Sequence, residues 1–333
     1  MTPSTAPILS VIVINWNGVQ FLPRCLQSLR EQTLRDFQVI LADNGSTDES
    51  VPLTKRDFPE VDIVSLGANL GYAEANNKAA ATSHARYLLF LNNDTHLAPD
   101  ALAAFVQAAE ANDQAHIWAP QQRTYDGKHL LHIGMSADVL SYPCGGRKTF
   151  YSDGAALFIR CEVFRQLGGF DQYHFIWWED SDLCWRAWLQ GYRVATLPQV
   201  VIFHKAGGTM GSSLPEDQQY TTSTGKRRLA YRNQLATLLK NYSTPALAFV
   251  LPLFGVQTLA EMTVFACTGQ RSVLRDVYVW AWHDLLRHRS YLRMMRRKIQ
   301  STRTVSDWAV LRRMEWKLAT VGLFLRIGIP TVK

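Results

Sequence analysis

The chain has 333 residues, enough for one large domain or two, and its hydrophobic content of 47% is ample for a buried core. Its five cysteines lie far apart without a Cys-x-x-Cys pair, which argues against a disulfide framework and fits a reducing compartment. The net charge of +7 is unevenly spread, because residues 226–333 hold 19 Lys and Arg against 5 Asp and Glu, whereas residues 1–225 hold 16 against 23. A basic rear half of this kind could face nucleic acid or anionic lipid.

Apolar runs alternate with amphipathic stretches over the first 111 residues. This rhythm is typical of βαβ units and predicts an α/β fold with a mostly parallel sheet. Ser46 or Thr47 is predicted to cap the helix that follows the second strand. No Gly-x-Gly-x-x-Gly follows the first strand, so dinucleotide binding is not indicated. Strands are predicted at Ile8–Ile14, Phe37–Ala42, Val61–Leu66 and Tyr87–Leu91, and helices at Leu22–Gln32, Tyr72–Ser83 and Pro99–Ala111.

The middle of the chain is less regular. Residues 112–150 carry only a weak signal, because their short apolar runs are broken by glycine and proline. A helix is predicted to begin near Glu179 and to end at Gly191. Strands are predicted within Tyr151–Arg160 and at Tyr192–Leu197 and Val200–Phe203, the last leading to His204.

Beyond Pro215 the pattern predicts helices and no strands. We therefore expect two domains, an α/β domain over residues 1–214 and a basic helical extension over residues 215–333. Since no signal peptide is evident, a cytoplasmic location is expected.

An apolar stretch at residues 245–267 comes close to the length of about 20 residues that spans a bilayer. Pro252, Gln257 and Glu261 interrupt it, and the helices that follow combine arginine with tryptophan and tyrosine. This combination favours a segment lying in the membrane interface, which would make the protein peripheral on the inner face of the cell membrane. The alternative is a soluble extension that packs on the first domain and forms a homodimer.

Three polar groups stand at strand ends or at a helix start: Asn92-Asn93-Asp94, Glu179-Asp180 and His204. A divalent cation such as Mg²⁺ or Mn²⁺ uses few protein ligands and leaves positions for substrate phosphates, and Asp94 with His204 would suit it. Taken singly, Asp94 is better interpreted as a turn former and His204 as a histidine satisfied at a sheet end. Only their occurrence together favours a metal site.

Glu179 and Asp180 allow two interpretations of equal weight. Acidic residues at a helix start cap free N–H groups and complement the helix dipole. However, the preceding Phe175-Ile-Trp-Trp178 would set a carboxylate beside apolar walls, where desolvation raises its pKa toward that of a general base.

Asn15, Asn17 and Asp43 follow the first two predicted strands, and Asn76 lies on the third predicted helix. Their amides and carboxylate could hydrogen-bond a nucleobase or a ribose. Ordinary turn chemistry is the alternative, above all for Asn17.

Six segments in this order resemble the family 2 inverting glycosyltransferases of GT-A fold, and together they cover about residues 8–210. The residues of the Asn-Asn-Asp and His-x-x-Gly-Gly segments are most similar to those of the bacterial rhamnosyltransferase-type branch, which includes enzymes acting on lipid-linked acceptors. The segments are Val11–Gly18, Leu41–Asp48, Asn69–Asn77, Phe90–Thr95, Trp178–Arg186 and His204–Thr209.

The resemblance implies a role for each matching residue. Asp180 corresponds to the general base, with Glu179 beside it, while Asp94 and His204 would bind a divalent cation. The first acid of the family's Asp-x-Asp motif is Asn92 here, which leaves a single carboxylate and puts the strength of metal binding in doubt. Nucleotide-sugar binding is assigned to Asn15, Asp43, Gly71, Asn76, Asn92 and Asn93, and acceptor binding to Asp153 and Trp178.

The implied reaction is a single displacement in which Asp180 takes the proton of the acceptor hydroxyl, so that the anomeric configuration inverts. The expected partners are a nucleotide-diphosphate sugar, with dTDP-rhamnose ahead of UDP-sugars, and a glycan or lipid-linked acceptor. A processive synthase is disfavoured because no Gln-x-x-Arg-Trp occurs, and no nucleic-acid motif supports a nucleic-acid partner. The alternative from another class is a non-catalytic nucleotide-sugar binder or membrane scaffold.

Overall fold

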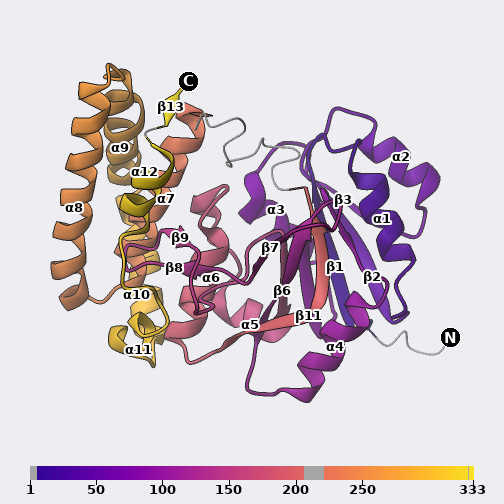
Figure 1. The fold of residues 1–333 in the computed structure, drawn as a ribbon. Coiled ribbons are helices and arrows are strands. Elements are labelled where there is room, and N and C mark those ends of the chain that lie inside the picture. The colour runs from indigo at the N-terminus through magenta and orange to yellow at the C-terminus, as the bar shows by residue number, and fades with distance from the viewer. Residues whose placement is uncertain (1–5, 206–220, 329) are drawn as a thin grey trace. The chain divides into compact units, whose positions relative to one another are not determined.

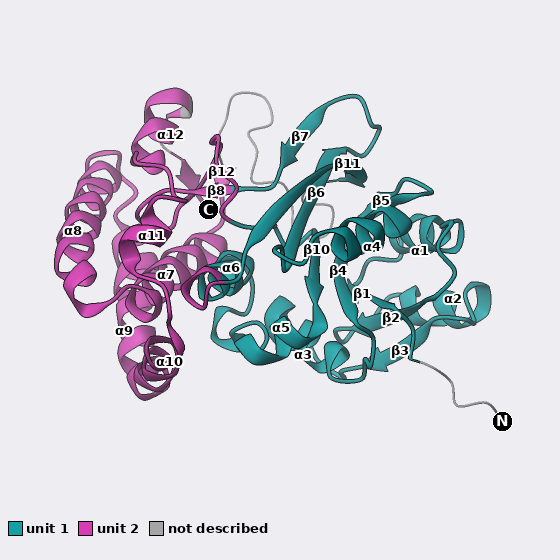
Figure 2. Cartoon of the chain, turned by 90° about the horizontal axis from the view of Figure 1, so that it is seen from below, with its two compact units in different colours: residues 1–135, 151–187, 192–211 teal, residues 136–150, 188–191, 212–333 magenta. Residues whose placement is uncertain are grey.

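The computed structural model describes residues 6–205, 221–328 and 330–333, so residues 206–209 of the predicted His204–Thr209 segment lie outside the described part. The chain divides into two compact units (Figure 2). Unit 1 holds the central sheet, and unit 2 holds the helices that follow residue 221. Unit 1 comprises residues 1–135, 151–187 and 192–211, and unit 2 comprises residues 136–150, 188–191 and 212–333.

Unit 1 is built on a mixed sheet (Figure 1). Its strands are β1 (Leu9–Asn15), β2 (Phe37–Asp43), β3 (Asp62–Ser65), β4 (Tyr87–Asn92), β5 (Thr95–Leu97), β6 (Ile117–Thr124), β7 (Leu130–Ile133), β10 (Ala156–Arg160) and β11 (Val194–His204). They run in the order β3-β2-β1-β4-β10-β6-β11-β5, with β7 paired to β6. Strands β3, β2, β1 and β4 are parallel, β10 is antiparallel to both of its neighbours, and β11 is parallel to β6. The predicted α/β class is confirmed.

Helices cover both faces of this sheet, so its central strands are buried along nearly their whole length and are mostly apolar. Helices α1 (Leu22–Arg30) and α4 (Ala101–Ala111) share one core cluster with Val11 and Leu89. On the opposite face lie α3 (Gly71–Ala80) and α5 (Cys161–Leu167), where the ring of Phe90 lies 4.8 Å from that of Phe164. Helices α2 (Ser50–Asp57) and α6 (Glu179–Leu189) complete the unit.

The structure corrects three details of the sequence-based expectation. Neither Ser46 nor Thr47 caps α2, because the backbone N–H of Ser50 donates to Asp48 Oδ1 at 3.1 Å and Ser46 Oγ instead accepts from Asn17 N at 3.0 Å. The weakly patterned region 112–150 contains β6, a strand with sheet neighbours on both sides. The two strands expected after Gly191 are one strand, β11, with an irregularity between Leu197 and Val201.

Unit 2 is mainly helical, as predicted. Serine side chains cap its helices, as when Ser223 Oγ accepts from Lys226 N at 3.2 Å. The unit also holds two pairs of two-residue strands, β8 (Ser136–Ala137) with β9 (Pro143–Cys144) and β12 (Thr221–Thr222) with β13 (Thr331–Val332). Only the second pair lies beyond Pro215 and departs from the expectation that this region has no strands. The helices are α7 (Thr224–Asn241), α8 (Thr244–Cys267), a π-helix (Leu274–Val279), α9 (Trp280–Arg287), α10 (Arg289–Thr302), α11 (Asp307–Leu311) and α12 (Ala319–Ile327).

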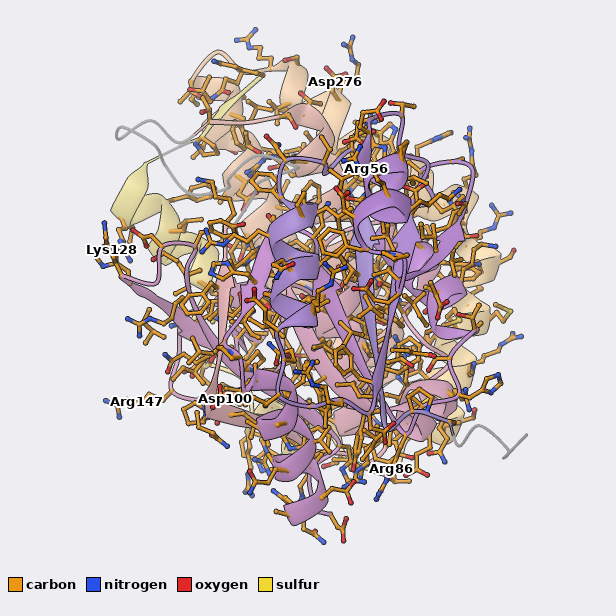
Figure 3. The ribbon with its side chains drawn as sticks, turned by 90° about the vertical axis from the view of Figure 1, so that its right-hand side faces the viewer. Arg56, Arg86, Asp100, Lys128, Arg147 and Asp276 are labelled. Carbon is orange, nitrogen blue, oxygen red and sulfur yellow. The ribbon has the colours of Figure 1, made fainter. Side chains whose placement is uncertain are left out.

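Charged side chains of unit 1 such as Arg56, Arg86 and Lys128 extend from its surface (Figure 3). Each forms an ion pair with an exposed partner, as Arg86 does with Glu110 at 2.8 Å. Water screens such pairs and they contribute little to stability. The fold therefore depends mainly on the buried core between the sheet and its helices.

Candidate functional site

The carboxyl ends of the parallel strands meet at one edge of the unit 1 sheet, the place where open α/β sheets bind ligands. Asn15 and Asp43 end β1 and β2 directly opposite each other in the register. Asp94 lies in the turn between β4 and β5, and His204 ends β11 opposite Thr95. The sheet topology thus brings four predicted residues from distant parts of the chain to a single edge.

Asp94 and His204 face each other at this edge. Asp94 Oδ1 lies 3.4 Å from His204 Nε2, and both side chains are largely buried. The backbone supports the arrangement, since Lys205 N donates to Asp94 O at 3.0 Å. Predicted from sequence as a metal-binding pair, the two residues are neighbours in the structure.

The hydrogen bonds of His204 leave its Nε2 atom available to a cation. His204 Nδ1 lies 3.1 Å from Gln122 Oε1, and Gln122 Nε2 donates to Asp153 Oδ1. Because the amide oxygen can only accept, the neutral imidazole carries its proton on Nδ1 and has its lone pair on Nε2. Nε2 is buried and makes no hydrogen bond within the described residues. A lone pair facing a carboxylate oxygen suits a divalent cation, so the donor set fits a metal.

Asp180 lies at the start of α6, where the segment before it is strained. Phe175, Trp177 and Trp178 have φ angles of 56°, 67° and 70°, a left-handed region that bulky residues rarely adopt. Such strain persists only where the surroundings impose it, and it concentrates at functional sites. Gly71 is required here, because a Cβ atom on it would lie 2.4 Å from Phe175 O.

The environment of Asp180 gives its carboxyl group an unusual affinity for protons. Burial, together with the negative charge of Asp153, raises the pKa of Asp180 to about 7. Its Oδ2 accepts from Gly154 N at 2.9 Å and its Oδ1 accepts from Ser181 N at 2.6 Å, so the residue also serves the helix start. Asp180 remains partly exposed, whereas Glu179 is buried and burial raises its pKa well above its ordinary value. Of the two acids, Asp180 is therefore the more accessible to solvent.

The predicted nucleotide-sugar residues divide into two sets. Asn15 Oδ1 accepts from Asn93 Nδ2 at 2.7 Å, and Asp43 Oδ1 accepts from Ser46 N at 3.3 Å, so these three lie in one polar network at the sheet edge. Asn92, the last residue of β4, borders the same edge. Asn76 is fully buried within α3, where its side-chain amide donates to Tyr72 O at 3.0 Å.

Asp153, predicted to bind the acceptor, has both carboxylate oxygens engaged by protein groups. Oδ1 accepts from Gln122, and Oδ2 lies 3.1 Å from His132 Nε2. Burial has the largest single effect on the pKa of Asp153 and raises it, but the interactions with His132, His204 and Gln122 together outweigh burial and the net shift is downward. Trp178, the other predicted acceptor residue, is buried and lies two residues before Asp180 in the chain. Sequence reasoning missed Gln122 and His132 because both lie in the region of weak signal.

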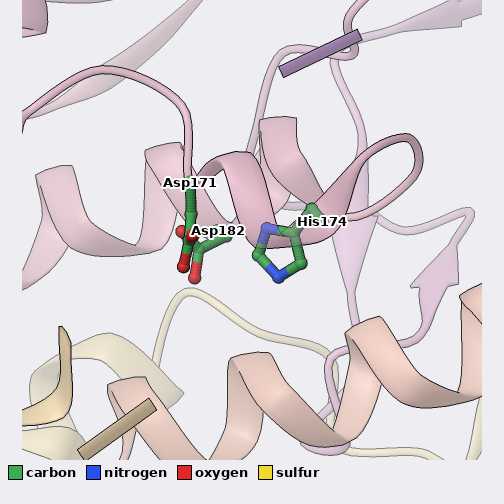
Figure 4. A group of neighbouring side chains, drawn as sticks. All are labelled: Asp171, His174 and Asp182. Carbon is green, nitrogen blue, oxygen red and sulfur yellow. The ribbon is translucent and has the colours of Figure 1, made fainter. Parts of the chain in front are cut away.

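A second group of Asp and His side chains lies elsewhere in unit 1 (Figure 4). The ligand atoms of Asp171, His174 and Asp182 all lie within 4.8 Å of one another, so the group could hold a metal ion. However, Asp182 Oδ2 already pairs with Arg186 Nε at 2.8 Å, and the guanidinium also donates to Leu167 O. A buried arginine supplies the positive charge that a cation would bring. We therefore interpret this group as structural.

Comparisons with known proteins agree with the fold and identify the family. Residues 10–168 match the family described as Glycosyl transferase family 2. The N-acetylglucosaminyl-diphospho-decaprenol L-rhamnosyltransferase of Mycobacterium tuberculosis is 30% identical over 239 residues, which cover 61% of this chain and 78% of that protein.

Two solved structures share the fold. GalNAc-T7 with UDP, GalNAc and Mn²⁺ has a TM-score of 0.63 at 13% identity, covering 99% of this chain and 59% of that one. The mannosyltransferase PcManGT of Pyrobaculum calidifontis with GDP-Man and Mn²⁺ has a TM-score of 0.54 at 18% identity, covering 90% and 87%. The fold is thus that of the GT-A glycosyltransferases. The chain belongs to glycosyltransferase family 2, and within it to the rhamnosyltransferase-like branch.

Proposed function

We propose that the chain is an inverting, metal-dependent glycosyltransferase that moves a sugar, rhamnose, from a nucleotide-diphosphate donor to a lipid-linked or glycan acceptor. The observation that carries this proposal is the state of Asp180, a partly exposed carboxyl group whose pKa is raised to about 7. A base with a pKa near the working pH accepts a proton most effectively during reaction.

Asp180 would take the proton of the acceptor hydroxyl as its oxygen attacks the anomeric carbon and the bond to the donor phosphate breaks. The hydrogen bond from Gly154 N fixes one carboxylate oxygen and orients the group. Because this is one displacement without a covalent enzyme intermediate, the configuration at the anomeric carbon inverts.

Asp94 and His204 would hold a divalent cation, Mg²⁺ or Mn²⁺. When bound, such an ion neutralises charge on the departing nucleoside diphosphate. With Asn92 in place of a second acid, the protein contributes one carboxylate and one imidazole at this point. Asn15, Asp43 and Asn93 would orient the nucleotide at the same edge.

The donor and acceptor are proposed from the relative. The mycobacterial protein is named as a rhamnosyltransferase acting on N-acetylglucosaminyl-diphospho-decaprenol, and this chain covers 78% of it. A nucleotide-linked rhamnose and a diphosphate-bearing lipid acceptor are therefore our first choices. UDP-sugars are the competing donor class.

A lipid-linked acceptor requires access to the membrane, and unit 2 offers a suitable surface. Helix α8 is apolar and long enough to span a bilayer, yet only 17% of its most apolar 18-residue stretch is buried. Phe249, Val256 and Leu259 on it are 80%, 65% and 65% exposed. Apolar exposure beside an excess of arginine supports a peripheral position on an anionic cytoplasmic membrane face. A homodimer that covers this surface is the alternative.

The decisive test combines binding with turnover. Nucleotide sugars would be screened by thermal shift with and without Mn²⁺ or Mg²⁺, and transfer to a prenyl-diphosphate-linked N-acetylglucosamine would then be measured with the binding donor. We expect a metal-dependent shift with one nucleotide class and a product of inverted configuration. A shift without turnover on glycan or lipid-linked acceptors would instead favour a non-catalytic nucleotide-sugar binder.

A further inference from the structure

Unit 2 contains a cavity of about 500 Å³ whose lining is dominated by cationic side chains. Neither Lys148, Arg312 nor Arg313 forms an ion pair with any residue that the structure describes. Such a concentration of charge favours a multivalent anion. The lining residues are Lys148, Thr149, Ala309, Arg312 and Arg313.

Neighbouring groups hold these cations in place. The guanidinium of Arg313 lies 4.9 Å from the centre of the buried Trp188 ring, and that of Arg312 lies 5.4 Å from the Trp308 ring. Lys148 Nζ donates to Met314 O at 3.3 Å. A stacked guanidinium loses little freedom when its planar fork binds two oxygens of a phosphate.

Two exposed tryptophans lie beside the cavity residues in the chain. Trp308 precedes Ala309 and is 55% exposed, while Trp316 is 62% exposed and packs edge-to-face on it at 5.7 Å. Exposed tryptophan is costly in water but favoured at the level of lipid head groups. A cationic cavity beside such a pair fits a phosphate at a membrane surface.

We propose that this cavity binds the phosphate or diphosphate head group of a membrane lipid. The proposal deepens the proposed function and rests on it for the identity of the lipid, because the acceptor named for the mycobacterial relative carries a diphosphate. Binding itself requires no sugar transfer, so it can be tested independently.

The full chain would be titrated with phosphatidylcholine vesicles, with and without prenyl diphosphate, and separately with inorganic pyrophosphate. The test variant combines Arg312→Gln with Arg313→Gln. The control combines Arg293→Gln with Arg297→Gln, which removes the same charge from exposed positions of α10. Losing two charge-assisted bonds should weaken binding to prenyl-diphosphate vesicles by at least about tenfold, while the control keeps most of it.

Equal losses in the two variants would mean bulk electrostatic attraction and would overturn the proposal. Pyrophosphate binding as tight as that of the lipid would assign the cavity to a soluble phosphate and would overturn the lipid assignment. If glycosyl transfer fails while vesicle binding follows the expected pattern, the proposed function fails and the cavity proposal stands.

A continuous network of polar side chains extends from His204 through Gln122 and Asp153 to His132. His204 Nδ1 meets Gln122 Oε1 at 3.1 Å, Gln122 donates to Asp153, and Asp153 Oδ2 meets His132 Nε2 at 3.1 Å. Gly154, which follows Asp153, donates to Asp180. One polar network therefore connects the proposed metal site with the backbone that holds the proposed base.

We infer that Gln122 is a positioning residue that keeps the imidazole of His204 in the tautomer with its proton on Nδ1. Asp153 fixes the orientation of the Gln122 amide, because its carboxylate can only accept from the NH₂ group. The lone pair on His204 Nε2 is then directed toward Asp94 before any ion arrives. Outer partners of this kind typically change metal affinity by about 10- to 100-fold when they are removed.

The tautomer can be observed in the metal-free protein by ¹⁵N NMR of histidine side chains, with His204→Gln identifying the signal. Gln122→Leu should shift His204 toward the Nε2–H form and weaken Mn²⁺ binding by about 10- to 100-fold. Gln121→Leu is the matched control, because the neighbouring side chain on β6 points to the other face of the sheet.

A charge swap keeps the inference testable if Gln122→Leu fails to fold. Gln122→Glu alone places two carboxylates together and should weaken Mn²⁺ binding, whereas Gln122→Glu with Asp153→Asn restores every donor and acceptor and should recover the Nδ1–H signal. An unchanged tautomer and unchanged Mn²⁺ affinity in Gln122→Leu, or a swap that recovers neither, would overturn the inference. Absence of Mn²⁺ binding in the wild type would contradict the proposed metal but not the tautomer.

Discussion

Two groups of Asp and His side chains in unit 1 look alike as residue types and differ in what surrounds them. In the group of Asp171, His174 and Asp182, the carboxylate of Asp182 faces the guanidinium of Arg186 at 2.8 Å. At the strand ends, Asp94 faces the lone pair of His204 at 3.4 Å. A compact cluster of possible ligand atoms is therefore weak evidence for metal binding when a neighbouring side chain already supplies the positive charge.

The difference also separates stability from activity. A buried arginine that bonds a carboxylate and two backbone carbonyls holds α6 against the segment around Leu167. The strand-end residues instead end secondary-structure elements and border the polar network of Asn15 and Asn93. We expect substitutions in the first group to change folding and substitutions at the strand ends to change chemistry.

The largest effect is expected from Asp180→Asn, which removes the proposed base while keeping its shape. Transfer should fall by about 10²- to 10⁴-fold, because an amide cannot accept the proton of the acceptor hydroxyl. Donor binding, measured by thermal shift, and the unfolding temperature should change little.

Asp100→Asn, at an exposed position (Figure 3), is the matched control and should retain activity. Turnover of Asp180→Asn near the wild-type rate would remove Asp180 as the base.

Asp182→Asn should affect stability instead. It leaves the Arg186 guanidinium, whose side chain is 3% exposed, without its carboxylate, and breaking a buried ion pair in this way costs about 3–5 kcal/mol. Urea unfolding would measure the loss.

The double variant Asp182→Leu with Arg186→Met removes both charges and should recover much of that stability. If Asp182→Asn left the free energy of unfolding unchanged but abolished metal binding, the structural interpretation of this group would be wrong.

The contrast between the two groups shows what the sequence could and could not predict. Periodicity and apolar runs predicted β1, β2, β4 and the helices between them, because both faces of those strands are buried. These patterns failed at β6, because its residues from Gln121 onward are polar, including the buried Gln122, and interrupt the apolar run. The capping prediction for α2 was wrong because Asp48, rather than Ser46 or Thr47, accepts from the backbone N–H of Ser50 at the helix start.

For the site, the sequence predicted that residues at the ends of strands would lie close together, because parallel strands end at a common edge. It could not place Gln122 or His132, since their roles depend on the register of β6 with β11 and β7. The sequence also gave no sign that Arg186 would neutralise Asp182, although the two are four residues apart on a helix. The roles of Gln122, His132 and Arg186 depend on contacts that only the three-dimensional structure shows.

Metal addition distinguishes the two groups directly. At about 100 times its dissociation constant, Mn²⁺ should stabilise the wild type by about 2.7 kcal/mol, and Asp94→Asn should lose most of this gain. Asp171→Asn, the matched change in the other group, should keep the gain although its stability without metal is lower. The reverse pattern would place the ion with Asp171, His174 and Asp182.

The smallest expected effect is a change in pH dependence. Transfer should rise with pH through about 7, as the carboxyl group of Asp180 loses the proton that burial and Asp153 help it retain. Between its ordinary pKa near 3.8 and about 7, the folded protein holds a proton on Asp180 that the unfolded chain releases. The free energy of unfolding therefore falls as pH rises through this window, and Asp180→Asn should flatten that slope. Urea unfolding at several pH values measures the slope; an equal slope in wild type and variant would show that Asp180 carries no raised pKa. The rise of transfer with pH would then have to come from another group.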